Sequence, residues 1–172
     1  MMKRFLVAIC FSIVTCGVSP AFADNAPAPT PSPNQNQAAQ AQAPATVSQI
    51  KWYTNYAQAV QDAAKNHKPI LMFFTGSDWC GWCKKMQQEI FSSPDFVSQV
   101  GNSFVFVDID FPMNQQLPAD VAQQNTQLKQ KYGVTGYPTV IILDANENFI
   151  AETGYRPGGG KAYADYLKQL LQ

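Results

Sequence analysis

From residue 48 onward, the chain alternates continuous apolar runs with segments of helical periodicity. Apolar runs of strand length lie at 70–74, 104–107 and 139–143, and a hairpin partner follows at 148–152. Continuous hydrophobicity is typical of strands that are covered on both faces of a sheet. Periodicity and helix-start signals predict helices at 53–66, 80–91, from 93 onward, 121–132 and 162–171, the last after a break at 158–160. The order predicts an α/β domain with a mixed central sheet flanked by helices.

The first residues have the pattern of an export signal. Lys3 and Arg4 precede an apolar run at 5–18, and Ala21-Phe22-Ala23 provides the small–any–small sequence that a signal peptidase accepts. The run of about fourteen residues is shorter than the ~20 needed to span a bilayer. We therefore predict a signal peptide at 1–23 and a periplasmic location.

Two alternatives to simple cleavage stay open. The segment can act as an uncleaved membrane anchor, or Cys16 can be the lipidated residue of a lipoprotein. Thr15 is a poor match for the small residue expected before a lipidated cysteine. A free exported protein is therefore the preferred prediction.

Residues 24–47 differ from the rest of the chain in composition. They are rich in Ala, Pro and Gln and contain no aromatic residue, so they cannot bury a core. We predict a disordered linker at 24–47 that leads to one folded domain at 48–172. Over the whole chain, 12 Lys and Arg balance 12 Asp and Glu, which gives no electrostatic case for binding nucleic acid or an anionic membrane.

Once the signal peptide is removed, the remaining cysteines are Cys80 and Cys83. A disulfide between them would close a very short loop and add little stability, so the pair indicates chemistry. Unpaired N–H groups at a helix start favour a thiolate. Cys80 comes first and is expected to be the exposed nucleophile. Cys83 follows by almost one turn and can resolve a mixed disulfide.

The cysteine pair could have two other roles, metal binding or a structural disulfide. Structural zinc needs about four ligands, and His67 is the single histidine, so no metal site is predicted. His67 is expected to be solvated. A purely structural disulfide stays open as the second alternative. Of the neighbouring aromatic residues, we expect Trp79 to pack partly beside the site and Trp82 to be exposed.

A second motif, Gly136-Tyr137-Pro138-Thr139, stands directly before an apolar strand. Proline cannot donate a hydrogen bond to a sheet, so at a strand start it marks an edge or a turn. The bond before Pro138 can be cis at small cost, or it can be an ordinary trans bond. The residues alone leave these two possibilities open.

Together the two motifs resemble the thioredoxin superfamily, and within it the small exported thioredoxin-like proteins. The match consists of Trp79-Cys80-x-x-Cys83-Lys84 after one strand and Gly136-Tyr137-Pro138-Thr139 before another, within 50–172. The resemblance implies a thioredoxin-like fold, with Cys80 as nucleophile, Cys83 as resolving thiol and Pro138 as a cis-proline. It also implies that the backbone of Tyr137 pairs with an extended substrate segment. The redox group would be the cysteine pair itself, without a cofactor.

Two features depart from the thioredoxin pattern. Gly81-Trp82 stands between the cysteines where thioredoxin usually has Gly-Pro, so the redox potential does not carry over. Thioredoxin also has a buried acid in the strand before the motif, whereas 72–74 has none. Asp78 is a nearby carboxylate in a turn, expected to be solvated and a candidate proton relay or pKa modifier. Lys84 either favours the thiolate by charge or is merely solvated.

The residues predict an exported thiol–disulfide oxidoreductase, and the resemblance implies that it reduces disulfides in envelope proteins. Reduction in an oxidising compartment requires electrons, which implies a membrane thiol donor of the DsbD type. We expect a monomer. Dedicated isomerases usually carry an added dimerisation domain, which 24–47 cannot be, so isomerisation is disfavoured. The same dithiol could instead oxidise or isomerise disulfides, and a thioredoxin-fold binding or assembly module with a closed disulfide is a further alternative.

Overall fold

The computed structural model describes residues 49–172, so the predicted signal peptide at 1–23 and linker at 24–47 lie outside the described residues. In chain order the elements are β1 (Trp52–Tyr53), α1 (Tyr56–Asn66), β2 (Ile70–Thr75), α2 (Gly81–Met86), η1 (Gln87–Phe91), α3 (Pro94–Val100), β3 (Val105–Asp110), α4 (Ala119–Lys131), β4 (Thr139–Leu143), β5 (Phe149–Thr153) and α5 (Gly159–Leu170). Within 49–172, none of the helices combines the length and the apolar character needed to cross a membrane.

A mixed sheet forms the centre of the domain, as the sequence predicts. Its strand order is β1-β3-β2-β4-β5. β3 runs parallel to both β1 and β2, whereas β4 is antiparallel to β2 and β5. β2 is the middle strand, and all six of its residues are buried. Burial on both faces explains why its sequence is continuously apolar.

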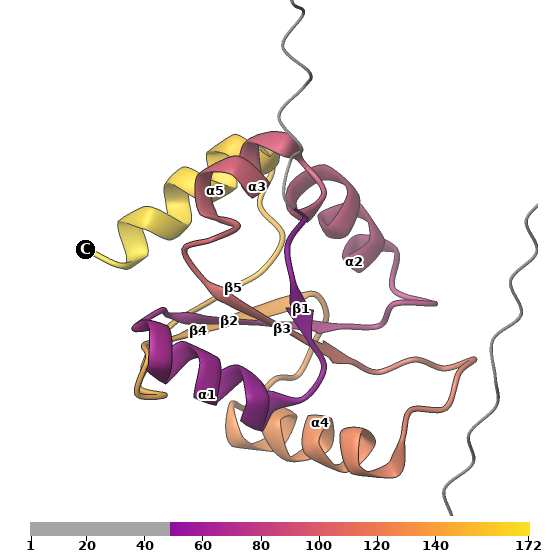
Figure 1. Cartoon of the computed structure of the whole chain (residues 1–172). Helices are drawn as coiled ribbons and strands as arrows, with labels where there is room; N and C mark the ends of the chain where they lie inside the picture. Colours follow the sequence, from indigo (N-terminus) through magenta and orange to yellow (C-terminus); the bar gives the residue numbers. More distant parts are fainter. Residues whose placement is uncertain (1–48) are drawn as a thin grey trace, which may run out of the picture. The chain divides into compact units, whose positions relative to one another are not determined.

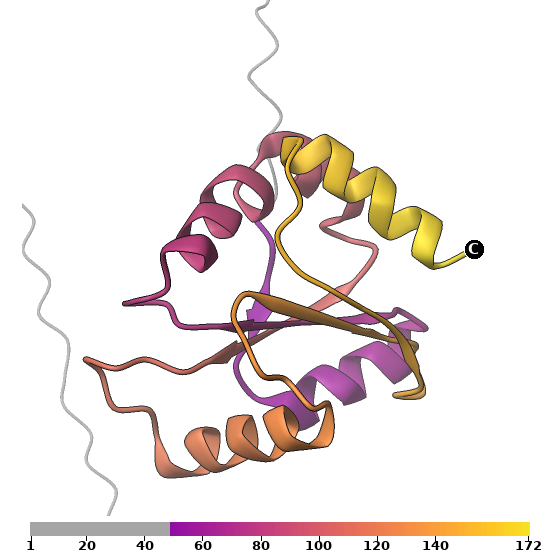
Figure 2. The ribbon, with the colours of Figure 1, turned by 180° about the vertical axis from the view of Figure 1, so that it is seen from behind.

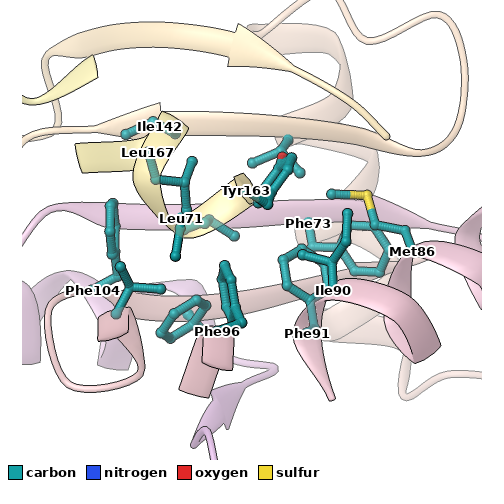
Figure 3. Packing of buried hydrophobic residues seen from close by; sticks show 14 of the residues in the cluster. Leu71, Phe73, Met86, Ile90, Phe91, Phe96, Phe104, Ile142, Tyr163 and Leu167 are labelled. Atoms are coloured by element: carbon teal, nitrogen blue, oxygen red, sulfur yellow. The ribbon is translucent and has the colours of Figure 1, made fainter. Parts of the chain in front are cut away.

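Helices cover both faces of the sheet (Figures 1 and 2). α1 and α4 lie on one face, and α2, α3 and α5 lie on the other. On the second face, aromatic rings from several elements pack edge to face around Phe91, whose ring centroid lies 5.0 Å from that of Phe73 and 5.4 Å from that of Phe96 (Figure 3). Met86 and Ile90, at the end of α2 and in η1, are fully buried in this cluster. The core therefore fixes α2 against one end of the sheet.

The prediction of one helix over 53–66 is wrong at its start. Trp52–Tyr53 forms a short strand that pairs with β3, and α1 begins only at Tyr56. The side chain of Asn55 caps α1 by accepting the backbone N–H of Gln58 at 3.0 Å. Trp52 packs its ring 5.2 Å from that of Phe91, which holds the strand against the core.

The predicted helix over 80–91 is α-helical only to Met86. η1 continues as a π-helical turn, in which the N–H of Ser92 donates to the carbonyl of Gln87 at 2.9 Å. The adjacent side chains of Ile90 and Phe91 are both buried there. The wider turn thus places two consecutive apolar residues in the core, a feature that simple helical periodicity does not predict.

The sequence predicts a break in structure over 158–160, but the observed break before α5 is shorter. Gly158 alone precedes α5, with φ of 116°, a value that favours glycine. Gly159 and Gly160 belong to the helix. A Cβ at Gly160 would collide with Ser93, so the glycine lets α5 approach the start of α3 closely. The other predicted strands and helices are present: β4 has the predicted ends, and the ends of the rest differ by at most three residues.

Candidate active site

A tight turn joins β2 to α2 and carries the cysteines to one end of the sheet. The backbone N–H of Cys80 donates to the carbonyl of Gly76 at 2.8 Å. The indole of Trp79 lies against Gly76, where an added Cβ would collide with the ring. Glycine at residue 76 therefore lets the turn fold closely behind Trp79.

Cys80 is the N-cap of α2, and Cys83 lies in the first turn. A disulfide joins them, with their Cα atoms 5.2 Å apart, and the backbone N–H of Cys83 donates to Sγ of Cys80 at 3.2 Å. Cys80 is 7% exposed and Cys83 is 1% exposed. The prediction of an exposed Cys80 thus holds only relative to Cys83, because both residues pack into the core cluster below α2.

The position of Cys80 at the start of α2 favours the thiolate form of its sulfur. The free N–H groups at the start of α2 stabilise negative charge at an N-cap sulfur. Gly81 follows on the exposed side, and no atom lies within 4 Å of the position that its Cβ would occupy. A side chain at residue 81 would thus meet no other part of the domain, and the supporting role of Gly81 stays a prediction.

The two tryptophans of the motif lie as the sequence predicts. Trp79 is 39% exposed and packs partly beside the site, with its indole Nε1–H donating to the carbonyl of Phe111 at 2.8 Å. Trp82 is 58% exposed, with its ring centroid 5.3 Å from that of Tyr155 in the segment after β5. Both indoles are thus available to a molecule that approaches Cys80.

The motif before β4 meets the cysteine motif in space. The Tyr137–Pro138 peptide bond is cis, which resolves the choice that the residues alone leave open. Phe74 pairs with Thr139 between β2 and β4, so Pro138 lies beside the end of β2, where the cysteine turn begins. The Tyr137 ring packs edge to face on Trp79 with centroids 5.8 Å apart. The register therefore unites two motifs that are far apart in the chain.

The sequence suggests that the Asp78 carboxylate is free in solvent, but in the structure it is hydrogen-bonded. Its carboxylate accepts the backbone N–H groups of Met113, at 3.0 Å, and Asn114, at 2.6 Å. These hydrogen bonds, that of Met113 foremost, hold the pKa of Asp78 below its usual value. The Lys84 amine donates to the backbone carbonyl of Asp78 at 2.8 Å. Both side chains thus brace the turn, and Asp78 is badly suited to relay a proton.

Asp108 on β3 is a site residue that the sequence analysis missed. It pairs with Phe73 across β2 and β3 and lines a cavity of about 520 Å³ together with Cys83 and Lys84. Burial, and secondarily the charge of Asp110, raises the pKa of Asp108 to about 7. An acid with this pKa exchanges protons readily at neutral pH. β2 has no acid where thioredoxin carries one, but the neighbouring strand β3 supplies Asp108 to the same cavity as Cys83.

Residues 49–172 bring together no group of three or more His, Cys, Asp or Glu side chains that could hold a metal ion. His67, the single histidine of the chain, is exposed at the C-cap of α1 with φ of 53°. The chemistry available at the site is therefore that of two thiols, an acid and the aromatic residues around them.

Known proteins share both the sequence and the fold. A family model for a thioredoxin-like domain matches residues 56–170. The disulfide bond reductase DsbH of Chlamydia pneumoniae is 40% identical over 129 residues, which are 75% of this chain and 77% of DsbH. A solved structure of a DsbH oxidoreductase has a TM-score of 0.72 at 40% identity, covering 77% of this chain and 91% of the other.

More distant relatives share only one region with this chain. The thioredoxin-related protein DsbJ of C. pneumoniae is 33% identical over 105 residues, 61% of this chain but 30% of DsbJ. The thiol:disulfide interchange protein DsbD of Haemophilus influenzae is 28% identical over 130 residues, 73% of this chain but 21% of DsbD. The family model, the DsbH similarity and the joined cysteines agree: the chain belongs to the thioredoxin-like domain family, as a thiol–disulfide oxidoreductase whose redox group is the Cys80–Cys83 pair.

Proposed function

We propose that the protein is exported and reduces disulfides in envelope proteins, with Cys80 as nucleophile and Cys83 as resolving thiol. The observation that carries the proposal is the position of Cys80, which caps α2 and is more accessible than its partner. The similarity to a protein named as a disulfide bond reductase supports the direction of electron flow. The signal pattern at 1–23 and the linker composition at 24–47 support export of a domain at 48–172.

The reaction proceeds in two exchanges. The Cys80 thiolate attacks one sulfur of the substrate disulfide, forms a mixed disulfide and releases the other substrate sulfur as a thiolate. Asp108 accepts the proton of Cys83, whose thiolate then attacks Sγ of Cys80. The second substrate sulfur leaves, and the released thiolates take up two protons. Two electrons have passed to the substrate, and the Cys80–Cys83 disulfide remains.

Trp79, Trp82 and Tyr137 would contact the substrate, because the two exposed indoles lie within two residues of Cys80 in the chain and the Tyr137 ring packs on Trp79. The segment before Pro138 would pair with an extended substrate chain by strand addition. A further round requires that the disulfide be reduced again. A membrane thiol donor of the DsbD type suits this step, since a periplasmic protein has no access to cytoplasmic reductants.

The direction is tested by the reduction potential of the pair, measured in a dithiothreitol or glutathione buffer. Thioredoxin lies near ~−270 mV and the oxidant DsbA near ~−120 mV. We expect a value near the thioredoxin end, together with reduction of insulin by the reduced protein. A value near that of DsbA would contradict a reductase and indicate an oxidase.

The assigned roles are tested by trapping. Cys83→Ser should accumulate mixed disulfides with envelope proteins, because the resolving thiol is gone. The matched Cys80→Ser variant should accumulate none, because Cys83 is the less accessible cysteine. Equal trapping by both variants would contradict the assignment of Cys80 as nucleophile.

A further inference from the structure

An aromatic cluster that begins at Trp79, the residue before Cys80, carries a lysine. The ring centroids of Trp79 and Tyr137 are 5.8 Å apart, and those of Tyr137 and Phe111 are 5.3 Å apart. Nζ of Lys129, on α4, lies 5.1 Å from the Tyr137 ring and 5.4 Å from the Phe111 ring. Attraction between the ammonium group and the two rings holds the charge in place. We call these four residues the Lys129 side.

On the side of Trp82, a similar arrangement has a compensated charge. Nζ of Lys85 lies 5.0 Å from the Trp82 ring and 5.3 Å from the Tyr155 ring. Glu89 forms an ion pair with Lys85 at 3.9 Å and accepts the Tyr155 hydroxyl at 2.6 Å. The positive charge on this side thus already has an internal carboxylate partner.

Lys129 has no such partner within residues 49–172. The ion pairs found there involve Lys85, Lys161 and Lys168. Asp110 precedes Phe111 in the chain, but its carboxylate accepts the backbone N–H and the hydroxyl of Ser77, at 2.8 and 2.6 Å. The carboxylate of Asp78 accepts backbone N–H groups. The Lys129 side therefore presents a fixed cation whose charge no ion pair neutralises.

We propose that Lys129 is a specificity-determining residue that favours disulfides flanked by Asp or Glu. The inference rests on the proposed function. In the mixed disulfide the substrate cysteine is bonded to Cys80, which directly follows Trp79 in the chain, so the residues beside it lie near Trp79 and the Tyr137 ring packed on it. An extended chain advances about 3.3 Å per residue, so a carboxylate a few residues from the cysteine can reach Lys129. Complementary charge of this kind mainly provides specificity and faster association.

The test compares two synthetic peptides, each with one internal disulfide, whose cysteines are flanked by Glu in one peptide and by Gln in the other. The second-order rate constant for oxidation of the reduced protein is followed by tryptophan fluorescence, and each rate is normalised to that of the same peptide with dithiothreitol. We expect a preference of about threefold for the Glu peptide at low salt, which is the size of effect that an exposed ion pair gives. The preference should shrink in high salt.

Variants of α4 separate the proposed role from a general charge effect. Lys129→Gln should abolish the preference, whereas Lys129→Arg should keep it. Lys131→Gln is the matched control, because Lys131 belongs to the same helix and lies over the ring of Tyr132, 5.1 Å away. This control should keep the preference.

The outcomes distinguish the inference from the function on which it rests. Equal normalised rates for the two peptides in the unaltered protein, or a preference that persists in Lys129→Gln, would overturn the role of Lys129 and leave the reductase proposal intact. Failure to reduce either peptide would contradict the proposed function, and the inference with it.

Discussion

Cys83 and Asp108 line the same cavity, one from helix α2 and the other from strand β3. The cysteine is almost fully buried, and the pKa of Asp108 is raised to about 7, first by burial and then by the charge of Asp110. Lys84 also lines this cavity. Cys83, the proposed resolving thiol, therefore shares its cavity with an acid whose raised pKa suits proton exchange near neutral pH.

The first prediction concerns the pH dependence of the resolving step. Below pH 7 Asp108 is protonated and cannot accept the Cys83 proton, so the rate of resolution should rise as the pH increases through about 7. Asp108→Asn should remove this rise and slow resolution about tenfold at pH 7.5, since general base catalysis contributes ~10²–10⁴ where it is fully used. The first-order phase after mixed-disulfide formation, followed between pH 5.5 and 8.5, measures the effect. Identical profiles for the variant and the parent would refute the role of Asp108.

The second prediction concerns stability. The unfolded pKa of an Asp is about 3.9, and the folded pKa of Asp108 is about 7. Between these values the folded state holds a proton that the unfolded state releases, so this group lowers stability as the pH rises from 4 to 7. Asp108→Asn removes this penalty. The gain in unfolding free energy of the oxidised variant over the parent should therefore be larger at pH 8 than at pH 4, by up to about 4 kcal/mol. Urea unfolding at both pH values tests this, with the exposed Glu152→Gln as control.

The third prediction assigns Asp78 to structure. Asp78→Ala should lower the melting temperature, because the carboxylate no longer accepts the N–H groups of Met113 and Asn114. Since hydrogen bonding lowers the pKa of Asp78, its contribution should be present at neutral pH and be lost as the pH falls below about 4. The pH profile of resolution should keep its shape. A profile that loses its rise near pH 7 would instead make Asp78 the proton acceptor.

The fourth prediction uses the contact between Gly76 and Trp79. Gly76→Ala adds a Cβ where the indole lies, so the ring must move and lose its hydrogen bond to Phe111. We expect a loss of about 1–3 kcal/mol in the free energy of unfolding, as for other overpacked sites. Tryptophan fluorescence should change as well. Gly81→Ala is the control, because its Cβ would meet open space, and it should change stability by less.

Local patterns in the sequence predict the parts of the site that are close together in the chain. Cys80 and Cys83 stand at a helix start, which is visible from the apolar run and the turn before them. Trp82 is exposed and Trp79 is partly packed, as the motif indicates. The proline at 138 signals a turn, although the residues alone do not distinguish cis from trans.

Contacts between distant segments explain what the sequence does not predict. Asp108 reaches the cavity only because β3 pairs with β2 in a register that places it beside Phe73. Asp78 is bound because the segment with Met113 and Asn114 folds back against the turn. β1 is two residues long and has no pattern of its own. Single-residue properties do not encode such pairings.

The central position of β2 affects how the domain opens. Its backbone is bonded on both sides, and its side chains are fully enclosed. Such strands exchange their amide hydrogens only when the whole domain unfolds, whereas edges and loops exchange through small local fluctuations. The cysteine turn is attached directly to the end of this strand. Thiol exchange at Cys80 can therefore cycle at the end of the sheet while the scaffold that aligns the two sulfurs stays closed through each turnover.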